Sequence, residues 1–155
     1  MHEAHEHGLL DTNVVVYFIA GVPAELAAGA RALVERAGEH MLLVVPALVV
    51  AECVWVLESK AFGHRPAEVA ATLQSFLSLP GIVCPEWDVV VEALAIHADG
   101  GADFVDAYLA AAAAVRGPRR VFTRNTRDFQ RSGIHLPDWW SAAGHAAPRD
   151  GAGPV

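Results

Sequence analysis

The sequence predicts an α/β fold, in which helices cover a mainly parallel sheet. Three observations support this. Short segments of β-type residues alternate with longer helical segments along the chain, which is typical of strands joined by crossover helices. The 155 residues suffice for one domain with one core. Hydrophobic residues make up 54% and charged residues 19%, a globular rather than a disordered composition.

The first half of the chain predicts two strands and three helices. Residues 7 to 21, HGLLDTNVVVYFIAG, indicate a strand that ends at Asp11 and a helix after it, because Asp-Thr-Asn offers side-chain caps. Residues 23 to 38 begin with Pro, end with Gly and repeat apolar residues every three or four positions, so they predict a helix. Residues 41 to 45, MLLVV, predict a strand. Residues 46 to 59, PALVVAECVWVLES, are apolar nearly all round and predict a buried helix.

The second half continues the alternation. Three further helices are expected at residues 65 to 81, 86 to 101 and 103 to 116, the last ending at the strong terminator Gly-Pro. Three short strands are expected at residues 82 to 84, 119 to 123 and 134 to 136, with a helical turn inside the loop at residues 124 to 133.

The two ends of the chain differ from the rest in composition. We expect one domain over residues 8 to 140, with flexible tails at residues 1 to 7 and 141 to 155, since the last segment is rich in Gly, Pro and small residues without periodicity. The N-terminal histidines are assigned no role, because a solvated tail explains them: His2, His5 and His7.

Location and redox state follow from what the sequence lacks. The N-terminus has no basic-then-apolar signal pattern, and the longest apolar run, residues 41 to 51, is too short to span a bilayer. We therefore expect a cytoplasmic protein with no membrane association. Cys53 and Cys84 lie in apolar surroundings without metal-type spacing, which favours buried free thiols.

Positive charge is concentrated in one short segment. The net charge of −7 disfavours nucleic-acid binding, yet six of the eleven Lys and Arg residues lie between positions 116 and 131. They are Arg116, Arg119, Arg120, Arg124, Arg127 and Arg131. This basic strip is compatible with phosphate contacts or an acidic partner, and equally with a solvated surface.

Several acids stand at the ends of predicted elements. Asp11 closes the first strand, and Asp128 follows the strand expected at residues 119 to 123. Asp103 and Asp106 begin the alanine-rich helix, where an N-cap and a capping-box role would explain them without any further function. Because parallel sheets gather ligands at the carboxyl ends of their strands, these acids could share one cleft.

Glu52 is the exception, since it lies in the middle of an apolar helix. A buried, unpaired carboxylate is costly, so Glu52 should be neutral, lie at a wet helix edge, or find a cation such as a buried Arg or a metal ion.

Converging carboxylates would require a cation. Each like-charge contact near 4 Å costs about 4 kcal/mol at an effective dielectric constant of 20. Oxygen ligands without His or Cys select a hard cation, so Mg²⁺ or Mn²⁺ is expected. Carboxylate-bound Mg²⁺ is typical of phosphodiester hydrolysis, in which the metal activates water and stabilises charge on the phosphate.

Four segments, in this order and spacing, resemble one known family. LLDTNVVV, the Glu of PALVVAECVWVL, ADFVDAYLAAAA and VFTRNTRDF are together similar to the PIN-domain ribonucleases, and most closely to the VapC-type toxins of bacterial toxin–antitoxin pairs. The resemblance covers about residues 8 to 137. It implies a PIN-like α/β/α sandwich with a mainly parallel sheet of four to five strands. It also implies metal-dependent endoribonuclease activity on RNA, and a homodimer inhibited by a small antitoxin protein.

The resemblance also assigns roles to residues. It makes Asp11 the first metal ligand, Asp106 the second and Glu52 the third acid of the site. Asp103 matches a supporting acid that only some relatives have. The last motif supplies further positions: Thr123 and Asn125 to position phosphate or water, Arg124 beside them, and Asp128 as a fourth catalytic acid. Many relatives have Asp in place of Asn125, and this difference puts a second metal ion in doubt.

Two other functions remain open. The first is an Mg²⁺-dependent phosphatase with Asp11 as nucleophile, although its general acid would then be Asn13, which cannot donate a proton as Asp does. The second is a PIN-like binding module without metal, for which apolar, Ala-rich helices would form the interface.

Overall fold

The computed structural model describes residues 6–39, 41–100, 102–117, 120–123 and 126–131. Its strands are β1 (Glu6–Leu9), β2 (Met41–Val44) and β3 (Ile82–Val83). Its helices are α1 (Thr12–Ala20), α2 (Ala24–Arg36), α3 (Ala47–Glu58), α4 (Pro66–Leu77), α5 (Trp87–Ala98), α6 (Phe104–Arg116) and α7 (Thr126–Arg131). The predicted alternation of strands and helices is confirmed, and every helix predicted from the sequence is present within a few residues of its expected ends.

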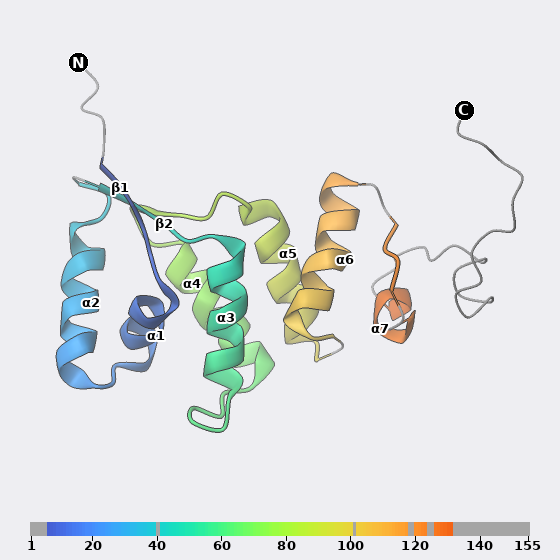
Figure 1. Ribbon diagram of the computed structural model, residues 1–155, viewed down its shortest axis with the longest axis horizontal. Helices are drawn as coiled ribbons and strands as arrows, with labels where there is room; N and C mark the ends of the chain where they lie inside the picture. The colour runs from blue at the N-terminus through green and yellow to red at the C-terminus, as the bar shows by residue number, and fades with distance from the viewer. Residues whose placement is uncertain (1–5, 40, 101, 118–119, 124–125, 132–155) are drawn as a thin grey trace, which may run out of the picture.

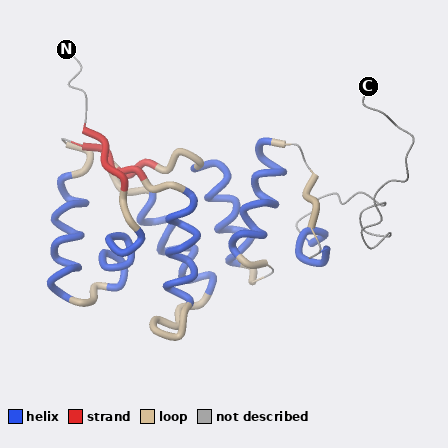
Figure 2. The backbone as a smooth tube through the Cα atoms, viewed as in Figure 1, coloured by secondary structure: helices blue, strands red, loops and turns tan. Residues whose placement is uncertain are grey.

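The sheet is parallel, as predicted, with strand order β1-β2-β3 over the residues described. Its register pairs Glu6 with Met41 and Leu43 with Ile82. Because the strands are parallel, the residues that follow them all lie at the same edge of the sheet. The strands lie together at the upper left, and the helices stand side by side below and to the right of them (Figure 2).

The described sheet has fewer strands than the four to five predicted. Of the strand predicted at residues 119 to 123, Arg120 forms a β-bridge and residues 121–123 have no regular secondary structure, while residue 119 lies outside the described residues. Val121 is nevertheless buried, against Ala110, Ala113 and Phe129, and this small cluster joins the segment to α6 and α7. The strand predicted at residues 134 to 136 lies outside the described residues.

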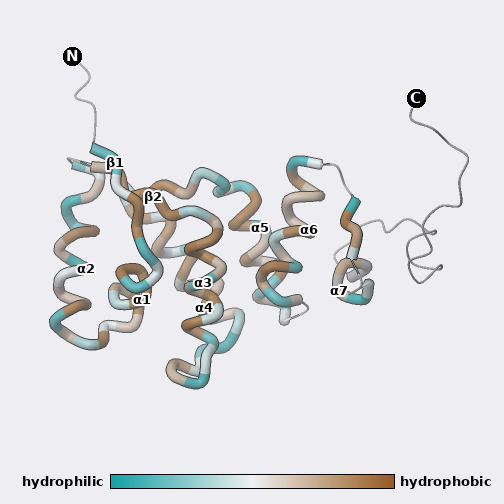
Figure 3. Tube along the Cα trace, in the orientation of Figure 1, coloured by the Kyte–Doolittle hydropathy of each residue, from teal (hydrophilic) through white to brown (hydrophobic). Residues whose placement is uncertain are grey.

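The main hydrophobic core lies between the sheet and helices α1, α3, α4, α5 and α6 (Figures 1 and 3). Val15, Val54 and Leu73 are among its fully buried side chains. Both cysteines are buried free thiols, as predicted. Helices α5 and α6 pack along each other, and α3 contacts α1, α4 and α6.

Helix α3 is less buried than its composition suggests. Leu48 is 76% exposed, and Glu52 and Trp55, one and two turns further along, are exposed too. These three residues, spaced by four and three, form a stripe on one side of the helix. The prediction of a buried helix was therefore wrong for this side, because an almost uniformly apolar sequence does not show which face meets solvent.

Two glycine turns make a close backbone contact beside the sheet. Gly38 precedes β2 and Gly81 precedes β3, and both have left-handed φ angles of 85° and 77°. A Cβ atom on Gly81 would lie 2.1 Å from the backbone nitrogen of Gly38. Only glycine fits here, so this contact fixes the approach of β3 to β2.

No single described helix is long and apolar enough to cross a membrane, although α1 and α2 pass such a test together, by length and composition only, with a bend of 107° between them.

Candidate active site at the carboxyl edge of the sheet

Asp11 and Thr12 join the end of β1 to the start of α1. Asp11 is the N-cap of α1, and its carboxylate accepts a hydrogen bond of 3.4 Å from the backbone N–H of Asn13. Its side chain is exposed at the sheet edge. The cap explains the local turn, while the second carboxylate oxygen faces no partner among the described residues.

Glu52 meets this turn from α3. The hydroxyl of Thr12 donates a hydrogen bond of 2.6 Å to Oε2 of Glu52, across 40 residues of sequence. Thr12 is only 4% exposed, so its hydroxyl is a fixed donor, whereas Glu52 reaches solvent. Glu52 thus lies at a wet helix edge beside the turn that begins with Asp11, and its partner is a hydroxyl rather than a buried Arg.

The negative charges of Asp11 and Glu52 affect the pKa of the Cys53 thiol. The pKa of Cys53 is raised from 9.0 to about 12, first by burial and then by the charges of Glu52 and Asp11. Both carboxylates therefore act on one buried thiol. We call Asp11, Thr12 and Glu52 the acid turn.

Asp103 and Asp106 occupy the first turn of α6. Asp103 is the N-cap, and its carboxylate accepts a hydrogen bond of 3.0 Å from the backbone N–H of Val105. This explains Asp103 as a cap. Asp106, three residues further on, is partly exposed and has an interaction of its own. Helix α6 contacts α3, which carries Glu52.

The donor set of the acid turn suits a hard cation. Among the described residues, no three His, Cys, Asp or Glu side chains lie close enough to hold a metal ion, so Asp11, Glu52 and Asp106 do not form a three-carboxylate site. Mg²⁺, however, is commonly bound by only one or two carboxylates, with waters and substrate phosphates completing its shell. Asp11 with one further carboxylate would meet that smaller requirement, and Asp106 remains the predicted second ligand.

A cavity of about 320 Å³ opens beside the acid turn. It lies between the first turns of α3 and α6 and the residue before α5, and its apolar wall consists of Ala47, Leu48, Ala51, Phe104 and Val105. The polar side consists of Glu86 and Tyr108, whose hydroxyl donates a hydrogen bond of 2.6 Å to Oε1 of Glu86. We call this hollow the α3–α6 cavity.

Sequence reasoning missed Glu86 and Tyr108. Glu86 comes three residues after β3, as Asp11 comes two residues after β1. The position of Glu86 just beyond a buried strand could have indicated a site residue, because the same position singled out Asp11.

The family comparison agrees with this architecture. The PIN domain family model matches residues 8–134, most of the chain. The chain belongs to the PIN domain family. The resemblance seen in the four segments is thereby confirmed for the family, and PIN domains are generally metal-dependent nucleases. A search of curated proteins found no match.

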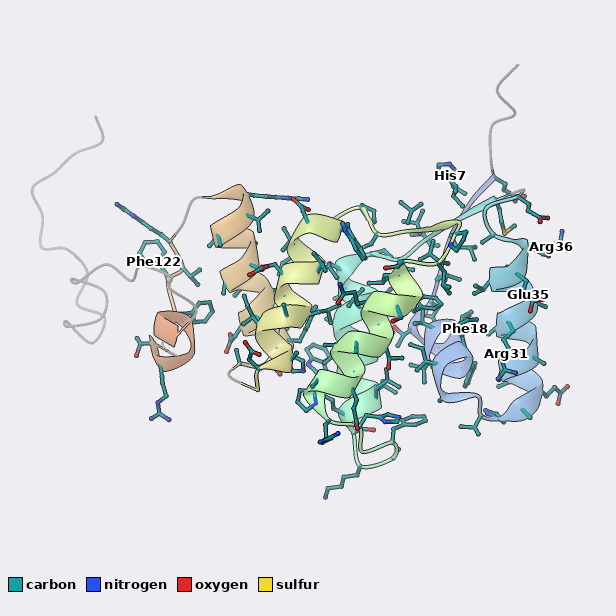
Figure 4. All side chains as sticks on the ribbon, turned by 180° about the vertical axis from the view of Figure 1, so that it is seen from behind. His7, Phe18, Arg31, Glu35, Arg36 and Phe122 are labelled. Carbon is teal, nitrogen blue, oxygen red and sulfur yellow. The ribbon has the colours of Figure 1, made fainter. Side chains whose placement is uncertain are left out.

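The last motif of this PIN domain is described only in part. Thr123 is partly exposed and makes an interaction of its own, while Arg124 and Asn125 lie outside the described residues. Asp128 belongs to α7, but its side chain is not among those described. Phe122 is 53% exposed and lies beside α7 (Figure 4). The roles assigned to Thr123, Arg124, Asn125 and Asp128 therefore stay predictions.

The basic strip of the PIN domain is not uniformly available. Arg116 makes two hydrogen bonds with the carboxylate of Asp88 on α5, and this contact lowers the pKa of Asp88. Arg120 and Arg127 are exposed. Arg120 and Arg127 are thus better placed than Arg116 to meet an external anion.

A buried histidine fixes the turn that leads into α6. His97, near the end of α5, hydrogen-bonds through Nε2 to Glu58 of α3 and through Nδ1 to the carbonyl oxygen of Ala102. Its ring also meets Phe104 edge-on, with centroids 6.1 Å apart. The start of α6, and Asp106 with it, is therefore tied to the C-terminal end of α3.

A second hollow, of about 360 Å³, contains none of the predicted site residues. It is lined by residues of α1, α2 and the loop before β3, among them Phe18, Arg31 and Glu35. Phe18 lies toward the helix that carries Arg31 and Glu35 (Figure 4). It is a feature of the α1–α2 packing and separate from the acid turn.

Proposed function

We propose that this PIN domain is an Mg²⁺-dependent (or Mn²⁺-dependent) endoribonuclease, and that it is the VapC-type toxin of a toxin–antitoxin pair. The observation that carries the nuclease proposal is the acid turn: the charges of Asp11 and Glu52 both raise the pKa of the Cys53 thiol, and the buried hydroxyl of Thr12 donates a hydrogen bond to Glu52. The acid turn lies at the sheet edge where α/β folds bind ligands. The PIN family match supports the reaction class.

The chain's own residues have separable roles in this reaction. A bound Mg²⁺ would supply charge stabilisation at the phosphate and a more acidic water. Asp11 and Asp106 are the proposed direct ligands. Glu52 and Asp128 act through water, orienting or deprotonating the nucleophile, and Thr12 holds Glu52 in the orientation this needs.

Substrate positioning is assigned to the residues after α6. Thr123 and Asn125 would hydrogen-bond phosphate or water, with Arg124 between them. Arg120 and Arg127, which are exposed, would hold the RNA backbone. These contacts are independent of base identity, so they would contribute affinity rather than sequence preference.

The partners proposed are a small antitoxin protein and a second copy of the chain, in the cytoplasm. The support for an interface is the stripe on α3, where large apolar side chains, Leu48 and Trp55, are exposed on either side of Glu52. Val105 and Leu109 of α6 are exposed as well.

Cleavage of single-stranded RNA with and without Mg²⁺ tests the nuclease proposal. We expect metal-dependent cleavage that is abolished by chelation and by Asp11→Asn or Asp106→Asn, with the circular dichroism spectrum unchanged. Glu25→Gln, which removes one exposed negative charge on α2, should cleave normally. Undiminished cleavage by both Asp variants would overturn the assignment.

A binding module without metal is the second candidate, favoured by the lack of a three-carboxylate group among the residues described. Thermal unfolding separates the two functions. Stabilisation by millimolar Mg²⁺ or Mn²⁺ that is lost in Asp11→Asn supports the nuclease, whereas no stabilisation of the native chain supports the binding module.

A further inference from the structure

The α3–α6 cavity lies at the same sheet edge as the acid turn. Ala47 follows β2 and Glu86 follows β3, just as Asp11 follows β1. Its volume of about 320 Å³ is at the lower end of the range of about 300–1,000 Å³ typical of small-molecule sites. The cavity is therefore the size of a small ring compound and lies where α/β folds bind ligands.

The cavity begins one helical turn from Glu52. Leu48 lines it and stands four residues before Glu52 on α3, so the two side chains are neighbours on the helix surface. A substrate phosphate at the acid turn would thus bring an adjacent part of the same nucleic acid to the mouth of the cavity. This step rests on the proposed function.

The lining selects a neutral, flat group with hydrogen-bond donors. The walls from α3 and α6 are apolar, and no Lys, Arg or His among the described residues lines the cavity, so a phosphate would find no cation in the lining. Arg116 is near enough for its charge to act on the pKa of Tyr108, but its guanidinium is hydrogen-bonded to Asp88. Glu86 is the acceptor. The Tyr108 hydroxyl occupies Oε1, which leaves Oε2 and the remaining lone pairs to accept from donors of a ligand.

The hydrogen bond to Glu86 also fixes the state of Tyr108. This hydrogen bond, followed by burial, raises the pKa of Tyr108 above its usual value, so the phenol remains a donor at neutral pH. The pair thus presents a carboxylate of defined orientation beside an aromatic ring, a combination suited to a nucleobase edge and face.

We infer that the α3–α6 cavity is a subsite for a guanine base of single-stranded RNA, next to the phosphate that is cleaved. Guanine is the one common base whose Watson–Crick edge carries two neighbouring donors, the ring N1–H and the exocyclic N2 amino group, which match the two oxygens of a carboxylate. Adenine and cytosine offer one amino donor beside a ring acceptor, and uracil offers one N–H between two acceptors. Glu86 would repel those acceptors.

The size of the preference follows from bidentate recognition. A good bidentate base contact discriminates against the wrong base by roughly 5- to 150-fold. We expect guanine to be enriched by that factor at one fixed position relative to the cut, with no preference elsewhere, since the Arg side chains contact only the backbone.

The test is sequencing of the products from a randomised single-stranded RNA cleaved by the native chain, Glu86→Gln and Tyr108→Phe. Glu86→Gln should still cleave RNA but lose most of the guanine enrichment. The NH₂ group of Gln replaces one carboxylate oxygen, so a hydrogen-bond donor would then face the N1–H and N2 amino donors of guanine. Tyr108→Phe should lose less of the guanine enrichment. Its aromatic ring still lines the cavity, and only the hydrogen bond that orients Glu86 is removed. Glu25→Gln should leave the profile unchanged. Replacing guanine by inosine, which lacks the N2 amino group, should reduce the enrichment with the native chain.

A binding measurement separates this inference from the proposed function. Saturation-transfer NMR with guanosine and adenosine should show guanosine contacts that Glu86→Gln removes, whether or not the chain cleaves RNA. Guanosine binding without RNA cleavage would overturn the nuclease and leave the subsite standing. Cleavage without guanine enrichment would overturn the subsite, and so would enrichment that Glu86→Gln does not change. A third contrary result is that the native protein does not bind guanosine and Leu48→Asp converts a dimer into monomers, because a second copy of the chain would then close the cavity.

Discussion

Thr12 shows how a single buried hydroxyl can orient a carboxylate, here that of the proposed catalytic acid Glu52. It is buried at the start of α1, and its hydrogen bond to Glu52 joins the start of α1 to α3. Partners that orient metal-site carboxylates typically contribute 10- to 100-fold to metal affinity or activity.

We therefore expect Thr12→Val, which keeps the shape but removes the donor, to lower the Mg²⁺-dependent cleavage rate by roughly 10- to 100-fold. Thr12→Ser, which keeps the hydroxyl, should stay within a few-fold of the native rate. Cleavage rates as a function of Mg²⁺ concentration provide the measurement. Equal rates for the Val and Ser variants would show that Glu52 is oriented by something else.

Cys53 gives a pH-dependent prediction at the same scale. Its pKa is about 12 in the folded chain and about 9.0 when unperturbed, so both states are protonated below pH 9 and the thiol does not affect stability there. Between pH 9 and 12 only the unfolded thiol ionises, so the free energy of unfolding should fall by about 1.4 kcal/mol per pH unit. Urea unfolding across this range should show a shallower decline in Cys53→Ala. Parallel declines would contradict the raised pKa.

At the scale of elements, the glycine contact between the turns before β2 and β3 is the most demanding feature. Gly81→Ala would place a Cβ against the backbone of Gly38, which cannot move without displacing β2. Gly63 also has a left-handed φ, of 67°, but faces open space. We expect Gly63→Ala to cost about 1 kcal/mol of stability, and Gly81→Ala at least about 2 kcal/mol more. Chemical denaturation measures both, and equal losses would show that the close contact does not hold.

The sequence predicted the elements well because each carries its own signal. Asp11 and Asp103 act as N-caps where side-chain chemistry places them, and Pro66 opens α4 as expected. The predictions that were wrong depended on tertiary packing, which no local sequence pattern indicates. The exposed side of α3 and the irregular course of residues 121–123 depend on which other elements pack there, so periodicity alone could not predict them.

The candidate site could be predicted only in part. The sequence singled out Asp11 and Glu52, but the link between their elements runs through Thr12, a contact that no spacing rule indicates because 40 residues separate the partners. The α3–α6 cavity was not foreseen, since Tyr108 reads as one more residue of an alanine-rich helix until Glu86 is seen beside it.

On the scale of the whole molecule, an acidic protein must still hold RNA if the proposed function is right. The net charge is −7, so local positive charge has to supply the contacts. The double variant Arg120→Gln, Arg127→Gln should weaken RNA binding for all sequences alike. It should also reduce the slope of log affinity against log salt concentration by an amount that corresponds to at most about two phosphate contacts. Arg116→Gln should have a smaller effect, because Asp88 already occupies its guanidinium. Filter binding at several salt concentrations distinguishes them, and an equal or larger effect of Arg116→Gln would place the RNA elsewhere.

The claim on which the account depends is that the carboxylates at the sheet edge bind a divalent cation. Calorimetric titration of Mn²⁺ into the metal-free chain tests it most directly, because it requires neither the RNA target nor the antitoxin. We expect saturable binding to the native chain that Asp11→Asn abolishes, while thermal unfolding without metal stays unchanged. Binding of equal strength in Asp11→Asn, or no binding to the native chain, would contradict it.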